Sequence, residues 1–176
     1  MDYKSKIILI SGPTASGKSK IAINLAKKID GEIINADSMQ VYKQLKILTA
    51  RPSGEDRKNI KHHLFGIIDV RKRFSTGQWL KECIKKINLI KKRKNVPIIV
   101  GGTGLYFKAL VDGLVRIPKF KLSDKNKILK LHNKLGQDQF YKKLIKLDPI
   151  SKQFVNSNDV NRSIRAYEVK KLTKKS

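Results

Sequence analysis

Gly12-Pro-Thr-Ala-Ser-Gly-Lys18-Ser19 is the stretch of this 176-residue sequence that decides the fold. It follows the apolar run Lys6-Ile-Ile-Leu-Ile10, which is typical of a buried strand. Beyond it, residues 18–29 place their apolar side chains on one face of a helix. A Gly-x-x-x-x-Gly-Lys-Ser loop between a strand and a helix is a phosphate-binding loop, or P-loop. The sequence therefore predicts a site for ATP, another nucleotide or a diphosphate.

Each residue type in this loop has a reason to lie near a phosphate. Glycines let successive backbone N–H groups point at one anion, and the start of the following helix adds partial positive charge. Lys18 supplies a full positive charge, and the hydroxyl of Ser19 is a suitable Mg²⁺ ligand. We expect the site to comprise all eight loop residues: Gly12, Pro13, Thr14, Ala15, Ser16, Gly17, Lys18 and Ser19.

Two more buried strands are predicted farther along the chain, Glu32-Ile-Ile-Asn-Ala36 and Pro97-Ile-Ile-Val100. Between them, residues 76–92 have the apolar spacing of a helix, whereas residues 63–69 are ambiguous and form a short strand at best. Strands that alternate with helices favour a parallel sheet with right-handed crossovers. We therefore predict an α/β fold, a P-loop-type parallel sheet flanked by helices, followed by a small basic helical section.

The character of the sequence changes near residue 115. Beyond it there is no strand-like run, and three basic stretches have helical periodicity: 123–135, 137–147 and 159–172. We predict a P-loop core with the diphosphate site over residues 1–115 and a basic helical section over residues 116–176. Helical periodicity runs to Lys174-Lys-Ser176 without a capping signal, so we expect this section to be incomplete.

Net charge is the most extreme property of the chain, since 40 Lys and Arg against 14 Asp and Glu give +26. Such a field attracts polyanions, and nucleic acid is the usual candidate. The sequence is also crowded with Ile, Lys and Asn, as AT-rich coding produces regardless of function. The charge alone therefore favours a nucleic-acid partner only weakly.

Several classes of protein are disfavoured by the sequence. The longest apolar run, Ile7 to Ile10, is far shorter than the roughly 20 residues of a membrane-spanning helix. The N-terminus lacks a signal-peptide layout. The single cysteine, Cys83, excludes an intrachain disulfide and a cysteine-based zinc site, and its amphipathic surroundings favour a core position. We expect a cytoplasmic monomer with no membrane partner.

Polar residues follow the second and third predicted strands. Asp37-Ser38-Met39-Gln40 comes after one strand and Gly101-Gly-Thr103 after the other. Ligands of open parallel sheets bind at the carboxyl ends of the strands, which places Asp37 near the reacting phosphate. On position alone, Asp37 is as well explained as a turn or N-cap residue, and Thr103 as the N-cap of a short helix.

The third strand ends in Gly101-Gly-Thr103, where an ATP hydrolase would be expected to carry a metal-binding carboxylate. Asp69 is a weak substitute. This deficit counts against ordinary ATP hydrolysis.

Five motifs in order resemble bacterial tRNA dimethylallyltransferases, which prenylate the exocyclic amine of the adenosine immediately 3′ of the anticodon. The motifs are Gly12-Pro-Thr-Ala-Ser-Gly-Lys-Ser19, Asn35-Ala-Asp-Ser-Met-Gln-Val-Tyr42, Thr49-Ala-Arg-Pro52, His62-His-Leu64 and Gly101-Gly-Thr-Gly-Leu-Tyr106. Asn161-Arg-Ser-Ile-Arg165 is similar to a later segment of that family that contacts tRNA. The resemblance covers essentially the whole chain.

The resemblance implies that the P-loop holds dimethylallyl diphosphate together with Mg²⁺, with Ser19 as the metal ligand. It implies that Asp37 accepts the proton of the attacking amine and that Thr103 helps to hold the reactants. The implied partner is the tRNA anticodon loop, contacted by the following residues: Asp37, Ser38, Met39, Gln40, Thr103, Lys125, Asn161, Arg162, Ser163, Ile164 and Arg165. The predicted section over residues 116–176 would then be tRNA-contacting.

The sequence departs from the family at Leu48, where glycine is usual, and the family continues beyond the length of this chain. The runner-up interpretation is a P-loop small-molecule kinase. A prenyltransferase that acts on free adenine nucleotides and a non-catalytic RNA-binding fragment also stay open. Arg162 and Arg165 share a helical face, which can equally be a solvated basic surface, while His62 and His63 lack a third metal ligand and are interpreted as structural.

Overall fold

A computed structural model describes residues 6–55, 57, 60–115, 117–118 and 120–175. The chain divides into two compact units, Met1–Leu114 and Val115–Ser176. We call the first the sheet unit and the second the helical unit, and describe each by itself.

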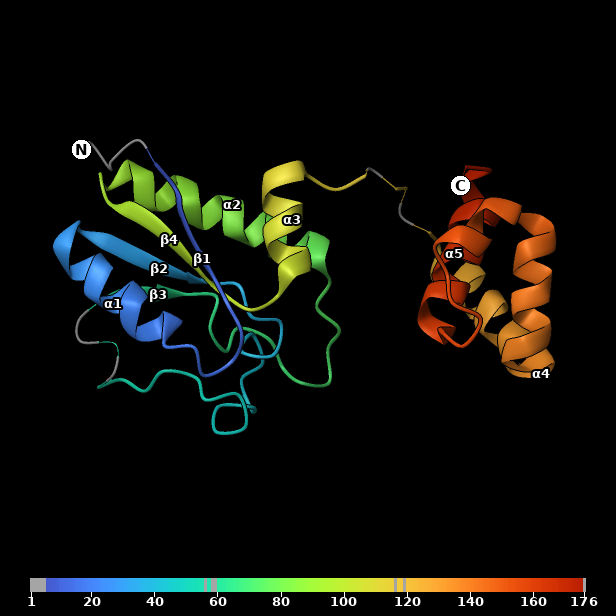
Figure 1. Ribbon diagram of the computed structural model, residues 1–176, viewed down its shortest axis with the longest axis horizontal. Helices are drawn as coiled ribbons and strands as arrows, with labels where there is room; N and C mark the ends of the chain where they lie inside the picture. The colour runs from blue at the N-terminus through green and yellow to red at the C-terminus, as the bar shows by residue number, and fades with distance from the viewer. Residues whose placement is uncertain (1–5, 56, 58–59, 116, 119, 176) are drawn as a thin grey trace. The chain divides into compact units, whose positions relative to one another are not determined.

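The sheet unit is built on four parallel strands in the order β1-β4-β2-β3 (Figure 1). These are β1 (Ile8–Ser11), β2 (Gly31–Asn35), β3 (His62–His63) and β4 (Val96–Gly101). The predicted parallel sheet is confirmed. The ambiguous stretch 63–69 overlaps the two-residue β3 only at His63 and adds an isolated parallel bridge between Ile68 and Tyr42. Because β4 lies between β1 and β2, the carboxyl ends of three strands meet at one edge.

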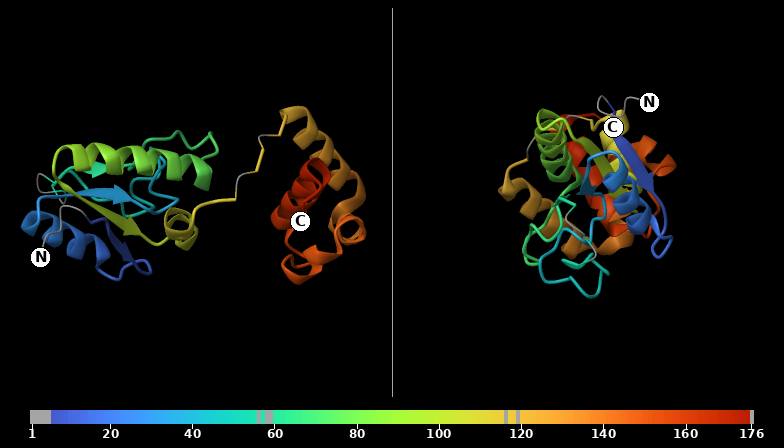
Figure 2. Two further views of the ribbon diagram at one scale, coloured as in Figure 1. Left: turned by 90° about the horizontal axis from the view of Figure 1, so that it is seen from above. Right: turned by 90° about the vertical axis from the view of Figure 1, so that its left-hand side faces the viewer.

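Helices cover both faces of this sheet (Figure 2). One face packs against α1 (Lys18–Lys28), and the other packs against α2 (Thr76–Lys92) and α3 (Gly104–Asp112). Successive side chains of a strand point to opposite faces, so Ile33 lies in the α1 cluster and Ile34 in the α2 cluster. Both faces are therefore apolar, as the run of buried residues in β2 and β4 predicts.

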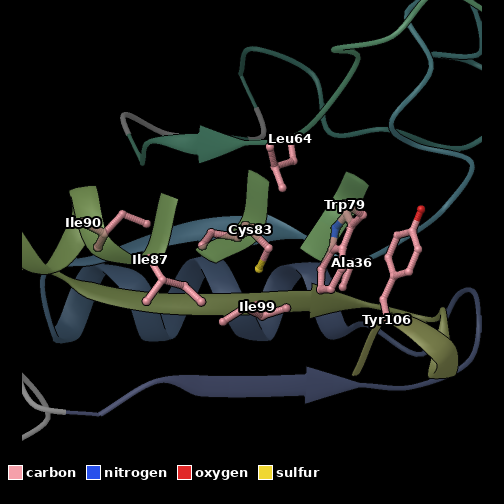
Figure 3. Packing of buried hydrophobic residues seen from close by; sticks show 9 residues of the cluster. Ala36, Leu64, Trp79, Cys83, Ile87, Ile90, Ile99 and Tyr106 are labelled. Atoms are coloured by element: carbon pink, nitrogen blue, oxygen red, sulfur yellow. The ribbon is translucent and has the colours of Figure 1, made fainter. Parts of the chain in front are cut away.

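The core on the α2 side is well packed around an aromatic pair (Figure 3). Trp79 stacks on Tyr106 with the ring centroids 4.2 Å apart, and both side chains are buried. Cys83 lies one turn farther along α2 and is fully buried. Burial raises the pKa of its thiol to about 12, so Cys83 is the core residue that the sequence predicts.

A buried ionic cluster closes the opposite, amino end of the sheet. The Glu32 carboxylate accepts hydrogen bonds from Arg93 Nε at 2.9 Å and Nη2 at 2.7 Å, and from Asn95 Nδ2 at 2.9 Å. His63 Nε2 lies 2.7 Å from its second oxygen. Burial opposes ionisation of Glu32, but these partners outweigh it and hold its pKa at about 2. The cluster fastens β3 and the α2–β4 connection to β2.

The helical unit contains α4 (Leu122–Leu147), a short 3₁₀ helix η1 (Pro149–Gln153) and α5 (Val160–Thr173). Gly136, with φ 73° and ψ 168°, interrupts α4, so its halves correspond to the first two helical stretches expected from the sequence. Phe140 and Leu144 are fully buried and pack with Tyr167 of α5. In the part of the chain that the structure describes, no helix is long and apolar enough to cross a membrane.

Candidate active site

The P-loop runs from the end of β1 to the start of α1. The backbone N–H of Gly12 donates to Gly101 O at 3.3 Å, which ties the loop to the end of β4. Gly17 is the N-cap of α1 and has φ 79°, a left-handed conformation that favours glycine. The loop therefore presents the amino end of α1 to the carboxyl edge of the sheet, where an anion is stabilised.

Lys18 and Ser19 stand at the first turn of α1. The Lys18 ammonium donates to Pro13 O at 2.6 Å, so the cation is folded back over its own loop. Ser19 is exposed. The full charge, the hydroxyl and the loop amides are thus gathered on one short segment, as the sequence predicts.

The ends of β2 and β4 approach closely beside this loop. A Cβ at Gly101 would collide with the carbonyl of Ala36 and would lie 2.7 Å from the amide nitrogen of Asp37, so only glycine fits there. Thr103 N donates to Ala36 O at 3.1 Å, and Thr103 Oγ1 accepts from Ser38 N at 2.9 Å. Thr103 is the N-cap residue of α3, but its hydroxyl makes no capping hydrogen bond. Instead, the hydroxyl fixes the segment that follows Asp37.

Asp37 is held by a buried amide that sequence reasoning missed. Asn35 is fully buried; its Oδ1 accepts from Asp37 N at 2.9 Å and its Nδ2 donates to Asp37 O at 2.9 Å. Asn35 Nδ2 also reaches Leu64 O at 3.2 Å, and Trp79 Nε1 donates to Asn35 O at 2.8 Å. An amide at the end of a predicted buried strand was the available signal, since a buried polar group needs partners.

The carboxylate of Asp37 has one oxygen engaged in a turn. Oδ1 accepts from Met39 N at 2.8 Å and Gln40 N at 3.4 Å, and among the described residues no donor lies on Oδ2. The turn interpretation of Asp37 is thus correct for one oxygen. The other is available to a ligand.

A cavity of about 600 Å³ opens between the P-loop and these strand ends. Eight of the predicted site residues line it: Thr14, Ala15, Gly17, Lys18, Ser19, Asp37, Met39 and Gln40. Five other predicted residues of the sheet unit do not line it: Gly12, Pro13, Ser16, Ser38 and Thr103. Much of the remaining lining is apolar and was not anticipated: Ala22, Ile33, Leu48, Pro52, Phe65 and Val100.

Two rings near the cavity have shifted pKa values. Burial lowers the pKa of His62, whose Nδ1 lies 2.8 Å from Ile60 O, so this imidazole is neutral at pH 7. His62 lines the cavity, while His63 belongs to the Glu32 cluster. Burial first, then the charges of Tyr42 and Asp37, raise the pKa of Tyr106 to about 12.

The predicted tRNA-contacting residues of the helical unit fall into two groups. Asn161, Arg162 and Arg165 are exposed on α5, whereas Lys125 is half-buried near the start of α4. Ser163 is fully buried and accepts from Gln137 Nε2 at 3.1 Å, and Ile164 packs against the helical core. In this structure Ser163 and Ile164 face inward.

The arginines are held by acids on their own helix. Arg162 Nε lies 3.4 Å from Asp159 Oδ2, and Arg165 Nη1 lies 3.0 Å from Glu168 Oε2. Both arginines line a second cavity of about 290 Å³ within the helical unit. The surface is therefore basic but partly neutralised.

A parallel sheet whose first strand leads through a Gly-x-x-x-x-Gly-Lys-Ser loop into a helix defines a P-loop α/β protein. The profile of the IPP transferase family matches residues 40–176, so the chain belongs to that family. The resemblance to tRNA dimethylallyltransferases is confirmed.

Two similar proteins are both named tRNA dimethylallyltransferase. The chain is 63% identical over 173 residues to the tRNA dimethylallyltransferase of Pelagibacter ubique and 44% identical to that of Rickettsia bellii, covering 98% of this chain and 55% of each relative. The chain thus spans about half the length of the curated relatives it matches.

Solved structures agree. A eukaryotic dimethylallyltransferase acting on tRNA has a TM-score of 0.79 at 34% identity, covering 93% of this chain and 41% of that one. The tRNA isopentenylpyrophosphate transferase of Bacillus halodurans has a TM-score of 0.63 at 36% identity, covering 96% of this chain and 56% of that one.

Proposed function

We propose that this chain transfers a dimethylallyl group from dimethylallyl diphosphate to the N6 amine of the adenosine 3′-adjacent to the tRNA anticodon. The observation that carries the proposal is the shared cavity: the P-loop and Asp37 line it together with a set of apolar side chains. A small-molecule kinase needs the P-loop, but it does not need an apolar lining that suits a prenyl group. Relatives and structural neighbours named for tRNA dimethylallyl transfer support the same reaction.

The P-loop would hold the diphosphate. As the allylic C–O bond breaks, negative charge grows on the leaving diphosphate, and the loop amides and Lys18 stabilise it. The Lys18 ammonium can do so while it keeps its bond to Pro13 O, because it carries three N–H donors. No covalent intermediate with the protein is needed.

Mg²⁺ fits this site only as an ion whose ligands come from both the protein and the substrate. No group of three or more His, Cys, Asp or Glu side chains that could hold a metal occurs among the described residues. Mg²⁺ commonly takes its ligands from substrate phosphates and water with few protein groups, and Ser19 is the protein ligand we propose. When bound, the ion would neutralise charge on the diphosphate.

Asp37 would act on the adenine. The amine is a poor nucleophile and becomes acidic as the new C–N bond forms, so a carboxylate within hydrogen-bond reach can orient it and accept its proton. Asp37 Oδ2 is the free oxygen, while Oδ1 keeps the turn in place. Thr103 would act by fixing Ser38, and Met39 and Gln40 would contact the extruded base.

The helical unit would bind tRNA by charge. Residues 115–176 hold 17 Lys and Arg against 5 Asp and Glu. Exposed Asn161, Arg162 and Arg165, with Lys125, would contact the backbone, and the inward-facing Ser163 and Ile164 would support α5. We thus propose that residues 1–115 carry the chemistry and residues 116–176 assist RNA binding.

The direct test is incubation of the chain with radiolabelled dimethylallyl diphosphate and total tRNA, followed by nucleoside digestion. We expect label in a single modified adenosine. Label released as free prenyl alcohol, or nucleotide-dependent phosphoryl transfer in its place, would contradict the proposal.

A further inference from the structure

The cavity has an exposed apolar side chain at its mouth. Leu48 lines the cavity although 81% of its surface is exposed. Its neighbour Ile47 is 95% exposed and does not line it. An exposed leucine gains no burial energy from the protein itself, so a ligand that covers it has that energy to gain.

The turn that carries Leu48 is firmly built. Thr49 N donates to Leu45 O at 3.1 Å and Arg51 N donates to Lys46 O at 3.1 Å, which makes a single helical turn. At its end, Arg51 Nη1 donates to Tyr42 O at 3.2 Å. Leu48 is therefore held in place by backbone bonds on both sides of it.

The same turn is tied to the segment that bears Asp37. Gln40 Nε2 donates to Thr49 O at 2.9 Å, and Gln40 N donates to Asp37 Oδ1 at 3.4 Å. A fixed chain of contacts thus runs from Asp37 through Gln40 to the turn. Asp37 and Leu48 both line this cavity, so a ligand that fills it meets both side chains.

We infer that Leu48 is a specificity-determining residue that covers the dimethylallyl group of the diphosphate substrate. The inference rests on the proposed function and deepens it. The P-loop end of the cavity takes the diphosphate, and the remaining wall near Leu48 is apolar, with Phe65 and Pro52. A five-carbon hydrocarbon group matches that wall, and a polar group in its place would lose its hydrogen bonds to water.

The experiment compares two ligands that share the diphosphate and differ in the hydrocarbon. Calorimetry on the 176-residue chain with Mg²⁺ measures the affinity for dimethylallyl diphosphate and for inorganic diphosphate. We expect Leu48→Ala to weaken the affinity for dimethylallyl diphosphate about fivefold and to leave the affinity for inorganic diphosphate unchanged. Leu48→Met, which conserves volume, should restore the affinity, and Ile47→Ala is the matched control that should change neither ligand.

Three outcomes would overturn the inference: Leu48→Ala without effect on dimethylallyl diphosphate, equal weakening of both ligands, or the same loss in Ile47→Ala. Equal binding of the two ligands by the unaltered chain would also overturn it. The proposed function stands or falls separately, on prenyl transfer to tRNA. Loss of base-dependent tRNA binding alone in Leu48→Ala would assign the residue to the adenine instead and refute the prenyl contact.

Discussion

The two units differ in the kind of anion site that we propose for each. In the sheet unit, the P-loop offers backbone N–H groups at a helix start, and the segment after β2 is fixed by hydrogen bonds that its backbone donates to the side chains of Asn35 and Thr103. In the helical unit, the cations are long side chains on an exposed helix face, partly paired with acids such as Asp159. In the first arrangement the binding groups are held in fixed positions. In the second, positive charge is present but the side chains that carry it are not fixed in one arrangement.

This difference explains why the sequence is informative about one unit and less so about the other. A site made of backbone requires particular residues at particular spacing, so it leaves a motif. A site made of surface charge tolerates many arrangements, so a basic helix bound to RNA and a merely solvated one look alike. Substitutions should therefore have large, all-or-none effects in the sheet unit and small, graded effects in the helical unit.

Asp37→Asn should give the largest effect. The amide keeps an oxygen for Met39 N, so the turn persists, but it cannot accept the proton. We expect both substrates to bind and single-turnover transfer to tRNA to fall by roughly two to four orders of magnitude. Asp69→Asn, which removes an acid paired with Arg71, is the matched control and should leave the rate unchanged. A rate within tenfold of the parent would show that Asp37 acts only as a turn residue.

Lys18→Ala comes next in size. Removing the ammonium takes away the one full positive charge that the P-loop brings to the cavity mouth. We expect the affinity for inorganic diphosphate to fall about a hundredfold, since charge-assisted hydrogen bonds are the strong ones. Calorimetry measures it, with Lys27→Ala at the other end of α1 as control. Unchanged affinity would show that the loop does not bind the diphosphate.

Much of this site could be predicted from sequence, and the exceptions have a common cause. The P-loop and the strands can be recognised in the sequence because glycine and apolar periodicity are local signals. Asn35 and Leu48 do not, because their roles depend on partners far along the chain: Leu64 and Trp79 for Asn35, and the P-loop wall for Leu48. The inward position of Ser163 was missed for the same reason, since Gln137 lies 26 residues away.

The rigid frame of the sheet unit can be tested at Glu32, far from the ligand. Its pKa of about 2 lies below the 4.5 of an unperturbed glutamate, so its stabilising contribution is present above about pH 4.5 and is lost as the pH falls toward 2. Glu32→Gln should lower the free energy of unfolding by about 2 kcal/mol at pH 7, which is less than for a fully buried pair because Arg93 is partly exposed.

Thermal unfolding followed from pH 7 to pH 2.5 measures this effect. The difference in Tm between parent and Glu32→Gln should be about 4–8 °C at pH 7 and shrink below pH 4.5. Glu82→Gln removes an acid from the exposed pair with Lys85 and serves as control, with a much smaller shift. A difference that persists unchanged at pH 2.5 would mean that ionisation of Glu32 is not its source.

The smallest expected effect is in the helical unit, at Arg162. Its side chain is 72% exposed and paired with Asp159, whereas the Arg165 guanidinium also lies over the Phe120 ring. Arg162→Ala should weaken tRNA binding only a few-fold at low salt and reduce the slope of log K against log[salt] by about one, as the loss of one phosphate contact requires. Lys85→Ala, in the sheet unit, removes the same charge and should leave the slope unchanged. Binding is measured at several salt concentrations with tRNAs that differ only at the target adenosine. A hundredfold loss, or a loss confined to the tRNA that carries the adenosine, would mean that α5 holds a structured site, and the contrast between the two units would fail.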